Sequence, residues 1–115
     1  MRLVVTSGEP AGIGPDLCVA LASRDWPFEL VVAGDPGLLR ERAGMLGREL
    51  VLRPYARGQA SGPQRAGELT VLAQPLARPA LAGRLDAVNA RCVLAMLDAA
   101  ADGCVAGEFA GMVTA

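Results

Sequence analysis

The chain has 115 residues, the size of one domain or of part of one, and it carries 11 basic and 12 acidic residues for a formal net charge of −1. The chain therefore has no excess of positive charge that would indicate binding to nucleic acid or to an anionic membrane surface. All basic residues are Arg, and neither His nor Lys is present, which excludes an imidazole base, a His metal ligand, a Schiff base and a phosphate-loop lysine among these residues.

Predicted strands and helices alternate through the first half of the chain. Short apolar runs indicate strands, and periodic stretches that begin near a Pro indicate helices. The predicted elements are strands over residues 2–6, 28–33 and 49–54 and helices over residues 15–23 and 37–46. Asp35 is placed to cap the second helix, and Gly47 to end it. This βαβαβ order over residues 2–54 predicts a parallel sheet with right-handed crossovers.

The second half begins with an irregular segment that is rich in Gly, Ala, Ser, Gln and Arg. The predicted elements are a loop over residues 55–67, a strand over 68–72, a helix over 84–102 and a final strand from 111. Gly103 is expected to end the helix. In open α/β sheets the binding crevice lies beyond the carboxyl ends of the strands. A chain that stops within its last strand is therefore expected to be a truncated part of a larger protein.

The turn after the first strand, GEPAGIGPD at residues 8–16, carries the most specific local pattern. One interpretation is a dinucleotide-binding fingerprint, in which Gly12 and Gly14 approach a pyrophosphate and Asp35 holds a ribose. Against it, a leucine stands where the third glycine belongs, and the proline at the helix start has no amide for a phosphate. The other interpretation is that the glycines only let a long turn adopt positive φ angles and pack closely. The residues alone leave both interpretations open.

The longer string VVTSGEPAGIGPDLCVALA resembles the start of the 4-hydroxythreonine-4-phosphate dehydrogenase family of vitamin B6 biosynthesis. Later stretches resemble the same family in register, namely ELVVAGDPGLLRERAGMLG, LVLRPY and AGRLDAVNARCVLAMLDAAADGCVAGEFAGMVTA. That family belongs to the isocitrate/isopropylmalate dehydrogenase superfamily. The resemblance therefore implies a three-layer α/β/α fold with a mostly parallel sheet, present here as an incomplete amino-terminal portion.

The resemblance also implies an activity and its cofactors. Family members use NAD or NADP and a divalent metal such as zinc, magnesium or cobalt. They oxidise 4-phosphooxy-L-threonine to 2-amino-3-oxo-4-phosphooxybutanoate, which decarboxylates to 3-amino-2-oxopropyl phosphate on the route to pyridoxine 5'-phosphate. The implied partners are this small phosphorylated amino-acid substrate and the second subunit of a homodimer.

The site residues that the resemblance implies lie in the glycine-rich turn and in the final strand. Glu9, Gly12, Ile13 and Gly14 are implied to border the cofactor cleft, and Thr114 to begin the substrate loop. The metal histidines and phosphate-binding basic residues of the family match no position of this sequence. The resemblance therefore implies no catalytic residue and no metal ligand within these 115 residues, and the chain alone is expected to be inactive. The alternative is a small, non-catalytic α/β domain for nucleotide binding or protein interaction.

Other polar residues and the thiols are interpreted as structural. Glu108, in the GEFAG turn, is typical of a turn or helix-cap partner, and Asn89 of a buried hydrogen bond or an exposed polar group. Cys18, Cys92 and Cys104 lack the CxxC spacing of a zinc site and are expected to be small hydrophobic side chains in a reducing cytosol. No apolar run is long enough for a signal peptide or a membrane span. We therefore expect a cytoplasmic protein.

Overall fold

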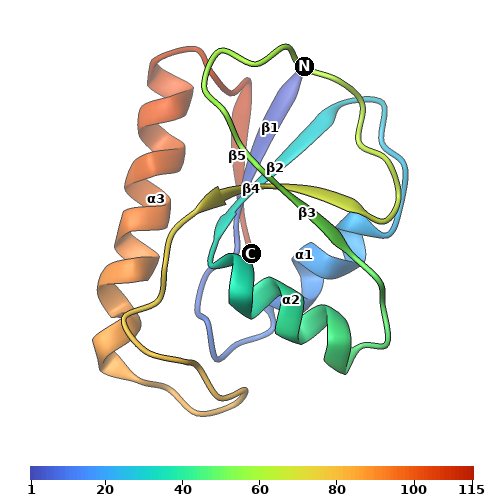
Figure 1. Cartoon of the computed structure of the whole chain (residues 1–115). Helices are drawn as coiled ribbons and strands as arrows, with labels where there is room; N and C mark the ends of the chain where they lie inside the picture. Colours follow the sequence, from blue (N-terminus) through green and yellow to red (C-terminus); the bar gives the residue numbers. More distant parts are fainter.

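The computed structural model describes residues 1–115, and a five-stranded sheet runs through its centre (Figure 1). The strands are β1 (Arg2–Thr6), β2 (Glu29–Gly34), β3 (Val51–Pro54), β4 (Glu68–Ala73) and β5 (Gly111–Thr114). They lie in the order β3-β4-β2-β1-β5, and every neighbouring pair is parallel. The predicted α/β fold with a mostly parallel sheet is confirmed.

Strand β4 lies between β2 and β3, so these two strands, which follow one another in the chain, do not pair. Leu69 and Val71 of β4 are only 1% and 3% exposed, whereas Val51 of β3 is 58% exposed. A strand that buries large apolar side chains belongs inside a parallel sheet, and a short, exposed strand suits its edge. Residues 55–67, between β3 and β4, form no helix or strand and are held by an isolated bridge to Trp26.

Helices cover both faces of the sheet (Figure 1). They are α1 (Gly14–Ala22), α2 (Pro36–Met45) and α3 (Ala90–Val105). Successive residues of a strand point to opposite faces. Val5 and Val32 accordingly join a core cluster with residues of α1 and α2, whereas Val4 and Val31 join a second cluster with residues of α3. The short apolar runs of β1 and β2 therefore supply both cores.

The last helix differs at both ends from the prediction over residues 84–102. Asp86 has an extended backbone, and its side chain caps a short 3-10 turn over Ala87–Asn89 that precedes α3. Gly103 does not end α3, which continues past it. A Cβ on Gly103 would lie 2.3 Å from a ring carbon of Phe109. The glycine therefore makes room for an aromatic side chain instead of stopping the helix.

Both predicted end signals of α2 are confirmed. The side chain of Asp35 accepts a hydrogen bond from the amide of Leu38 at 2.9 Å, as an N-cap residue does. Gly47 follows the helix with a φ of 67°. The amide of Arg48 then donates to the carbonyl oxygen of Ala43 at 2.8 Å, which satisfies one of the carbonyl groups that a helix end leaves free.

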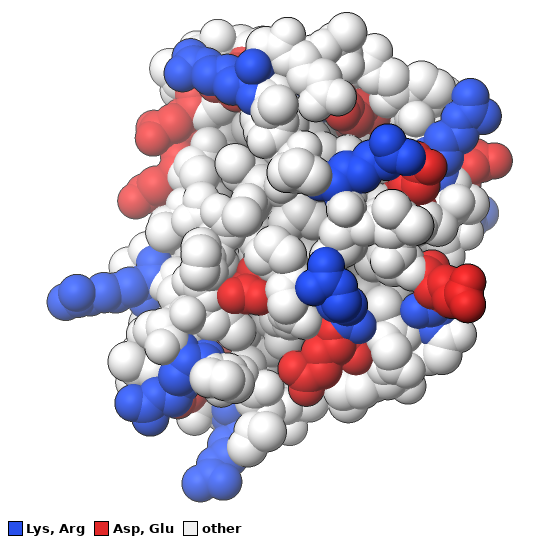
Figure 2. Space-filling model, viewed as in Figure 1, with Lys and Arg blue, Asp and Glu red and all other residues white.

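The surface shows acidic and basic side chains interspersed (Figure 2). Some form exposed ion pairs, such as Arg53 with Glu68 at 3.0 Å and Arg78 with Asp86 at 3.5 Å. Exposed pairs of this kind add little to stability because water screens them. No helix combines the length and the apolar character that crossing a membrane requires.

Candidate functional site

The carboxyl ends of the parallel strands form one edge of the sheet, and the residues predicted to contact ligands gather there. β1 ends at Thr6 and leads into the turn that contains Glu9, Gly12 and Ile13, after which α1 begins. Thr114 lies beside Thr6 in the neighbouring strand β5. Open α/β sheets place their ligands at this edge, so it is the candidate site.

At two positions of the turn, close backbone contacts within the chain leave no space for any side chain, so both positions must be glycine. Gly8 has a φ of 70°, and a Cβ on it would lie 2.3 Å from the carbonyl oxygen of Ala115. A Cβ on Gly14, the first residue of α1, would lie 1.9 Å from the carbonyl oxygen of Ser7. For Gly12 the closest approach would be 3.3 Å, a contact that a small shift relieves. Backbone packing therefore accounts for Gly8 and Gly14 without any ligand.

The outer surface of the turn offers an apolar side chain, a carboxylate and unused amides. Ile13 is 68% exposed. One oxygen of the partly buried Glu9 carboxylate accepts a hydrogen bond from the amide of Ala11 at 3.1 Å, and the other takes part in none. The amides of the partly buried Glu9 and the exposed Ile13 also take part in none of the hydrogen bonds within the chain. Such a surface can pack against a flat ring and exchange hydrogen bonds with hydroxyl, carbonyl or amide groups.

A buried arginine on α2 holds this turn, and the sequence analysis missed it. Arg42 is 2% exposed, and its guanidinium donates to the carbonyl oxygens of Pro10 at 2.7 Å and Gly12 at 2.9 Å. It also pairs with the carboxylate of Asp16 at 3.0 Å. One signal was available in the sequence, because Arg42 follows the apolar Leu39 at helical spacing. A charged residue on the core-facing side of a helix is rare unless it is paired.

Thr114 lines an apolar groove of about 400 Å³ between β5 and α1. Its other walls include Leu17, Leu21 and Trp26. The next residue, Ala115, donates its amide to the carbonyl oxygen of Thr6 at 3.1 Å, and its own carbonyl packs against the turn. The structure therefore brings Thr114 and the glycine-rich turn to the same edge of the sheet.

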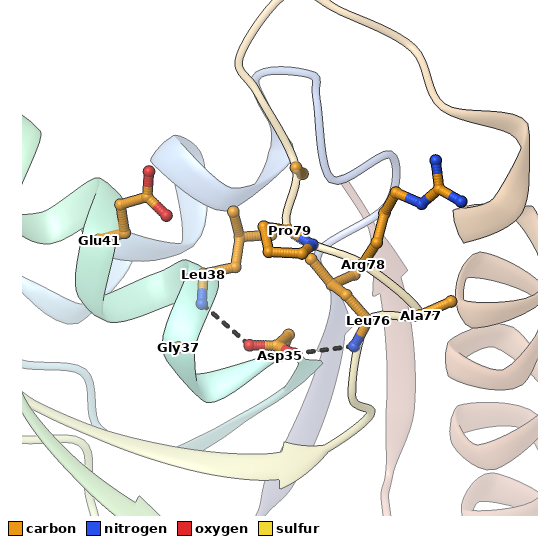
Figure 3. A pocket seen from close by; sticks show the side chains of 9 residues that line it. Asp35, Gly37, Leu38, Glu41, Leu76, Ala77, Arg78 and Pro79 are labelled. Carbon is orange, nitrogen blue, oxygen red and sulfur yellow. Dashed lines mark hydrogen bonds between the residues drawn. The ribbon is translucent and has the colours of Figure 1, made fainter.

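A second hollow of about 400 Å³ opens between the start of α2 and residues 76–80 (Figure 3). Asp35 lies in its wall, where one carboxylate oxygen accepts from the amide of Leu38 and the other from the amide of Leu76 at 2.8 Å. Both oxygens are thus bonded to the backbone. Asp35 acts as the turn and capping residue that the sequence predicts. Its carboxylate is therefore not free to bind a ribose, as the dinucleotide-binding interpretation of the sequence required.

Asn89 holds the segment that closes this hollow. It is 1% exposed, and its side-chain oxygen accepts hydrogen bonds from the amides of Ala77 at 3.1 Å and Arg78 at 3.2 Å. Its side-chain amide donates to the carbonyl oxygen of Arg78 at 3.1 Å. Of the two roles expected for Asn89, the buried hydrogen bond is therefore confirmed.

The turn suits a ring and hydroxyl groups better than a diphosphate. Pro10 and Pro15 have no amide hydrogen, and Asp16 places a carboxylate in the first turn of α1. Leu17 occupies the place of the third glycine, and the guanidinium of Arg42 is buried and already paired. The residues also do not fit a metal ion, because no group of three or more His, Cys, Asp or Glu side chains is arranged to hold one.

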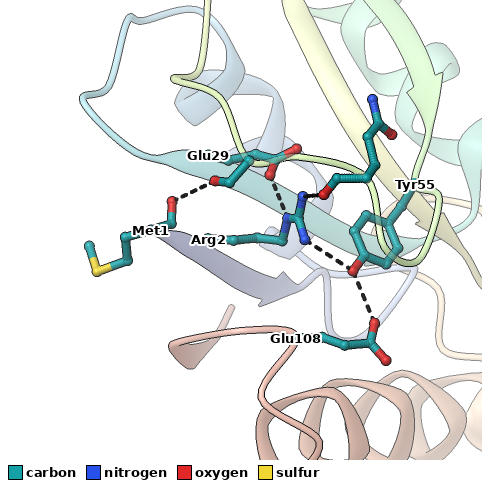
Figure 4. Close-up of polar contacts among 7 residues, drawn as sticks. Met1, Arg2, Glu29, Tyr55 and Glu108 are labelled. Carbon is teal, nitrogen blue, oxygen red and sulfur yellow. Dashed lines mark hydrogen bonds and ion pairs between the residues drawn. The ribbon is translucent and has the colours of Figure 1, made fainter.

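Glu108, just before β5, belongs to a polar cluster with residues at the starts of β1 and β2 and residues that follow β3 (Figure 4). The hydroxyl of Tyr55 donates to one carboxylate oxygen of Glu108 at 3.0 Å, and Arg57 pairs with the other at 2.9 Å. Arg2, at the start of β1, donates to Glu29 and to the Tyr55 hydroxyl. Burial and the hydrogen bond with Glu108 raise the pKa of Tyr55. Glu108 is thus bonded to distant side chains, and not to the turn or helix end that the sequence analysis expected.

Comparison with known proteins places this architecture in a family. The curated 4-hydroxythreonine-4-phosphate dehydrogenase of Azoarcus sp. (strain BH72) is 60% identical over 113 residues, which are 98% of this chain and 33% of that protein. The enzyme of the same name from Erwinia tasmaniensis is 57% identical over 113 residues, again 98% of this chain and 34% of that protein. The chain thus spans about a third of the length of the curated relatives that it matches.

A solved structure leads to the same group of proteins. A protein from Salmonella typhimurium, provisionally described as a 4-hydroxythreonine-4-phosphate dehydrogenase, superposes with a TM-score of 0.85 and 26% identity, over 99% of this chain and 37% of that one. The family model described as "Pyridoxal phosphate biosynthetic protein PdxA" matches residues 26–115. Because that match covers well over half of the chain, this chain belongs to the PdxA family of pyridoxal phosphate biosynthetic proteins.

Proposed function

We propose that this chain forms part of a dehydrogenase subunit that oxidises 4-phosphooxy-L-threonine with NAD or NADP. The observation that carries the proposal is the 60% identity, over 98% of the chain, to a protein named 4-hydroxythreonine-4-phosphate dehydrogenase. Since the chain spans about a third of such relatives, the activity is assigned to the whole subunit. The cytoplasm and a homodimer are part of the proposal and rest on the family resemblance.

The proposed reaction removes two hydrogen atoms from a secondary alcohol. The carbinol carbon of the substrate loses a hydride and the hydroxyl loses a proton, which gives 2-amino-3-oxo-4-phosphooxybutanoate. Loss of carbon dioxide from this β-keto acid then gives 3-amino-2-oxopropyl phosphate, on the route to pyridoxine 5'-phosphate. When bound, the nicotinamide supplies the hydride acceptor.

Within this scheme, Glu9, Gly12, Ile13 and Gly14 border the dinucleotide and Thr114 borders the substrate. The exposed Ile13 side chain packs against a ring of the dinucleotide, and the unused oxygen of Glu9 accepts a hydrogen bond from a ribose hydroxyl or the carboxamide. Gly12 presents backbone at the same surface, and the buried Gly14 supports the turn from its inner face. The adjacency of the last strand and the turn supports a shared site for the two ligands.

The divalent metal lies outside this part of the proposal. The side chains of this chain do not form a metal site, so the zinc, magnesium or cobalt that the family resemblance implies takes its ligands from other segments or from a second subunit. The 115-residue chain alone is accordingly expected to show no turnover with substrate, NAD or NADP, and any of these metals. Clear turnover by the isolated chain would contradict this assignment.

The test of the proposed contact residues uses the longer polypeptide that the proposal requires. Ile13→Glu places a carboxylate where a ring is proposed to pack, so the KM for NAD or NADP should rise about tenfold or more with little change in thermal stability. Val105→Glu is the matched control, because Val105 is 91% exposed at the end of α3. An equal KM in Ile13→Glu and wild type would refute the contact, and absence of any dehydrogenase activity in the wild type would favour the non-catalytic interaction domain.

A further inference from the structure

Arg42 is the one charged residue that joins α2 to the glycine-rich turn. It lies on the core-facing side of α2 and is 2% exposed, and its guanidinium donates to the carbonyl oxygens of Pro10 and Gly12. Its only carboxylate partner is Asp16, at 3.0 Å. Because Arg42 is buried, it cannot meet a ligand directly, and any effect on ligand binding has to pass through the turn.

The two carbonyl groups held by Arg42 determine where the following amides point. Every peptide bond in the chain is trans, and in a trans peptide the C=O and the next N–H point in opposite directions. Since the Gly12 carbonyl points at Arg42, the amide of Ile13 points away from α2, and no group in the chain accepts its hydrogen.

The same geometry at Pro10 orients a carboxylate. The Pro10 carbonyl points at Arg42, so the amide of Ala11 points the opposite way, where it donates to a carboxylate oxygen of Glu9 at 3.1 Å. That hydrogen bond leaves the second oxygen of Glu9 unused at the outer surface. Two of the polar groups that the turn offers to a ligand, the Ile13 amide and the Glu9 carboxylate, are therefore oriented, through one peptide plane each, by one buried side chain.

We propose that Arg42 is a positioning residue for dinucleotide binding, which sets the directions of the Ile13 amide and the Glu9 carboxylate. The inference rests on the proposed function of the turn, and it adds a residue that makes no contact with the ligand. Asp16 serves as the counter-charge that allows the guanidinium to be buried. A side chain that only filled space at this position would not need two donors in a fixed fork.

The test compares four variants in the longer, active polypeptide. Arg42→Met removes the donors and keeps an unbranched apolar side chain, and it should raise the KM for NAD or NADP about tenfold while kcat changes less than about twofold. Arg42→Lys keeps the charge but loses the fork, so it should restore part of this affinity. Arg40→Met is the matched control, because Arg40 is exposed on the same helix and forms no hydrogen bond or ion pair.

Asp16→Asn separates positioning from charge compensation. It removes the counter-charge but keeps a side-chain oxygen that can accept from the guanidinium, and it leaves the two carbonyl bonds of Arg42 in place. Thermal stability should therefore fall, while the KM should stay within about twofold of the wild-type value. A rise in KM equal to that of Arg42→Met would overturn the proposal, as would an unchanged KM in Arg42→Met. If Arg42→Met does not fold, Arg42→Lys carries the test, and a wild-type KM in that variant overturns the proposal.

Amide hydrogen exchange distinguishes failure of this inference from failure of the proposed function. In the wild-type polypeptide, saturating NAD or NADP should slow exchange of the Ile13 amide. If exchange at Ile13 does not change, the turn does not contact the dinucleotide and the proposed function of these residues fails. If exchange slows but the Arg42 variants keep the wild-type KM, the turn contact stands and the positioning role of Arg42 alone is refuted.

Discussion

Replacement of Gly14 by alanine should destabilise the chain strongly. A Cβ at this position would lie 1.9 Å from the carbonyl oxygen of Ser7, and real Cβ contacts essentially never fall below 3.0 Å, so the two groups must separate by about 1.1 Å. The obstacle is backbone that is itself held, because the amide of Ser7 donates to the carbonyl oxygen of Ala33 at 3.0 Å. Overpacking against fixed groups costs about 3 kcal/mol, and the helical preference of alanine offsets at most about 1 kcal/mol. The expected loss of unfolding free energy is therefore about 2 kcal/mol or more.

Gly44→Ala is the matched control, with the opposite expected sign. Gly44 also lies in a helix, α2, but a Cβ on it would meet nothing within 4 Å. Alanine should therefore stabilise the chain by about 0.5–1 kcal/mol. Equilibrium urea unfolding, followed by the fluorescence of the single tryptophan, Trp26, measures both variants. A loss of unfolding free energy below about 0.5 kcal/mol in Gly14→Ala would refute the steric argument. It would favour instead the interpretation that this glycine allows a ligand to approach the backbone.

Two further predictions concern titratable groups. Burial and Glu108 raise the pKa of Tyr55 above its usual 10.0, so the neutral phenol stabilises the fold below pH 10.0 and this contribution is lost as the pH rises through the folded-state pKa. Tyr55→Phe should flatten the alkaline part of the curve of unfolding free energy against pH, and an unaltered curve would count against the assignment. Burial raises the pKa of Cys18 to about 12, so iodoacetamide should alkylate Cys92 and Cys104 in the native chain and all three thiols only after unfolding. Intact-mass measurement of a third adduct on the folded chain would contradict this prediction.

Local sequence patterns located most elements, but they could not supply relations between distant segments. The apolar runs that contain Val4 and Val31 bury both faces of the sheet, which is typical of parallel strands. The place of β4 between β2 and β3 depends on which strand buries more apolar surface, and that comparison involves the whole sheet. The predicted helix over residues 84–102 failed at its start, because Leu85 shares the helical spacing of Met96 but is 78% exposed beyond the capped start of the helix.

The same contrast holds at the candidate site. Glycine and proline interrupt regular structure, so the turn was located from the sequence, and its place after a parallel strand put it at the ligand-binding edge. Arg42 was not found, because two of its partners are carbonyl groups of Pro10 and Gly12, 32 and 30 positions away. Any residue supplies a carbonyl group, so such a contact leaves no pattern in the sequence. The helical spacing of Arg42 after Leu39 indicates burial but not its partner.

The two faces of this one turn impose different demands on the residues that form it. On the inner face, Gly14 leaves room for the Ser7 carbonyl because it has no side chain, and Arg42 donates hydrogen bonds to two further carbonyl groups. Substitutions there should therefore alter stability and the shape of the turn. On the outer face, Ile13 and Glu9 are oriented by those inner contacts but contribute little to the core. Substitutions of these two residues should therefore alter ligand binding while stability stays nearly unchanged. The glycine at position 14 is therefore required for the structure of the turn, whereas Ile13 and Glu9 serve ligand binding, although all three lie within one short stretch of the sequence.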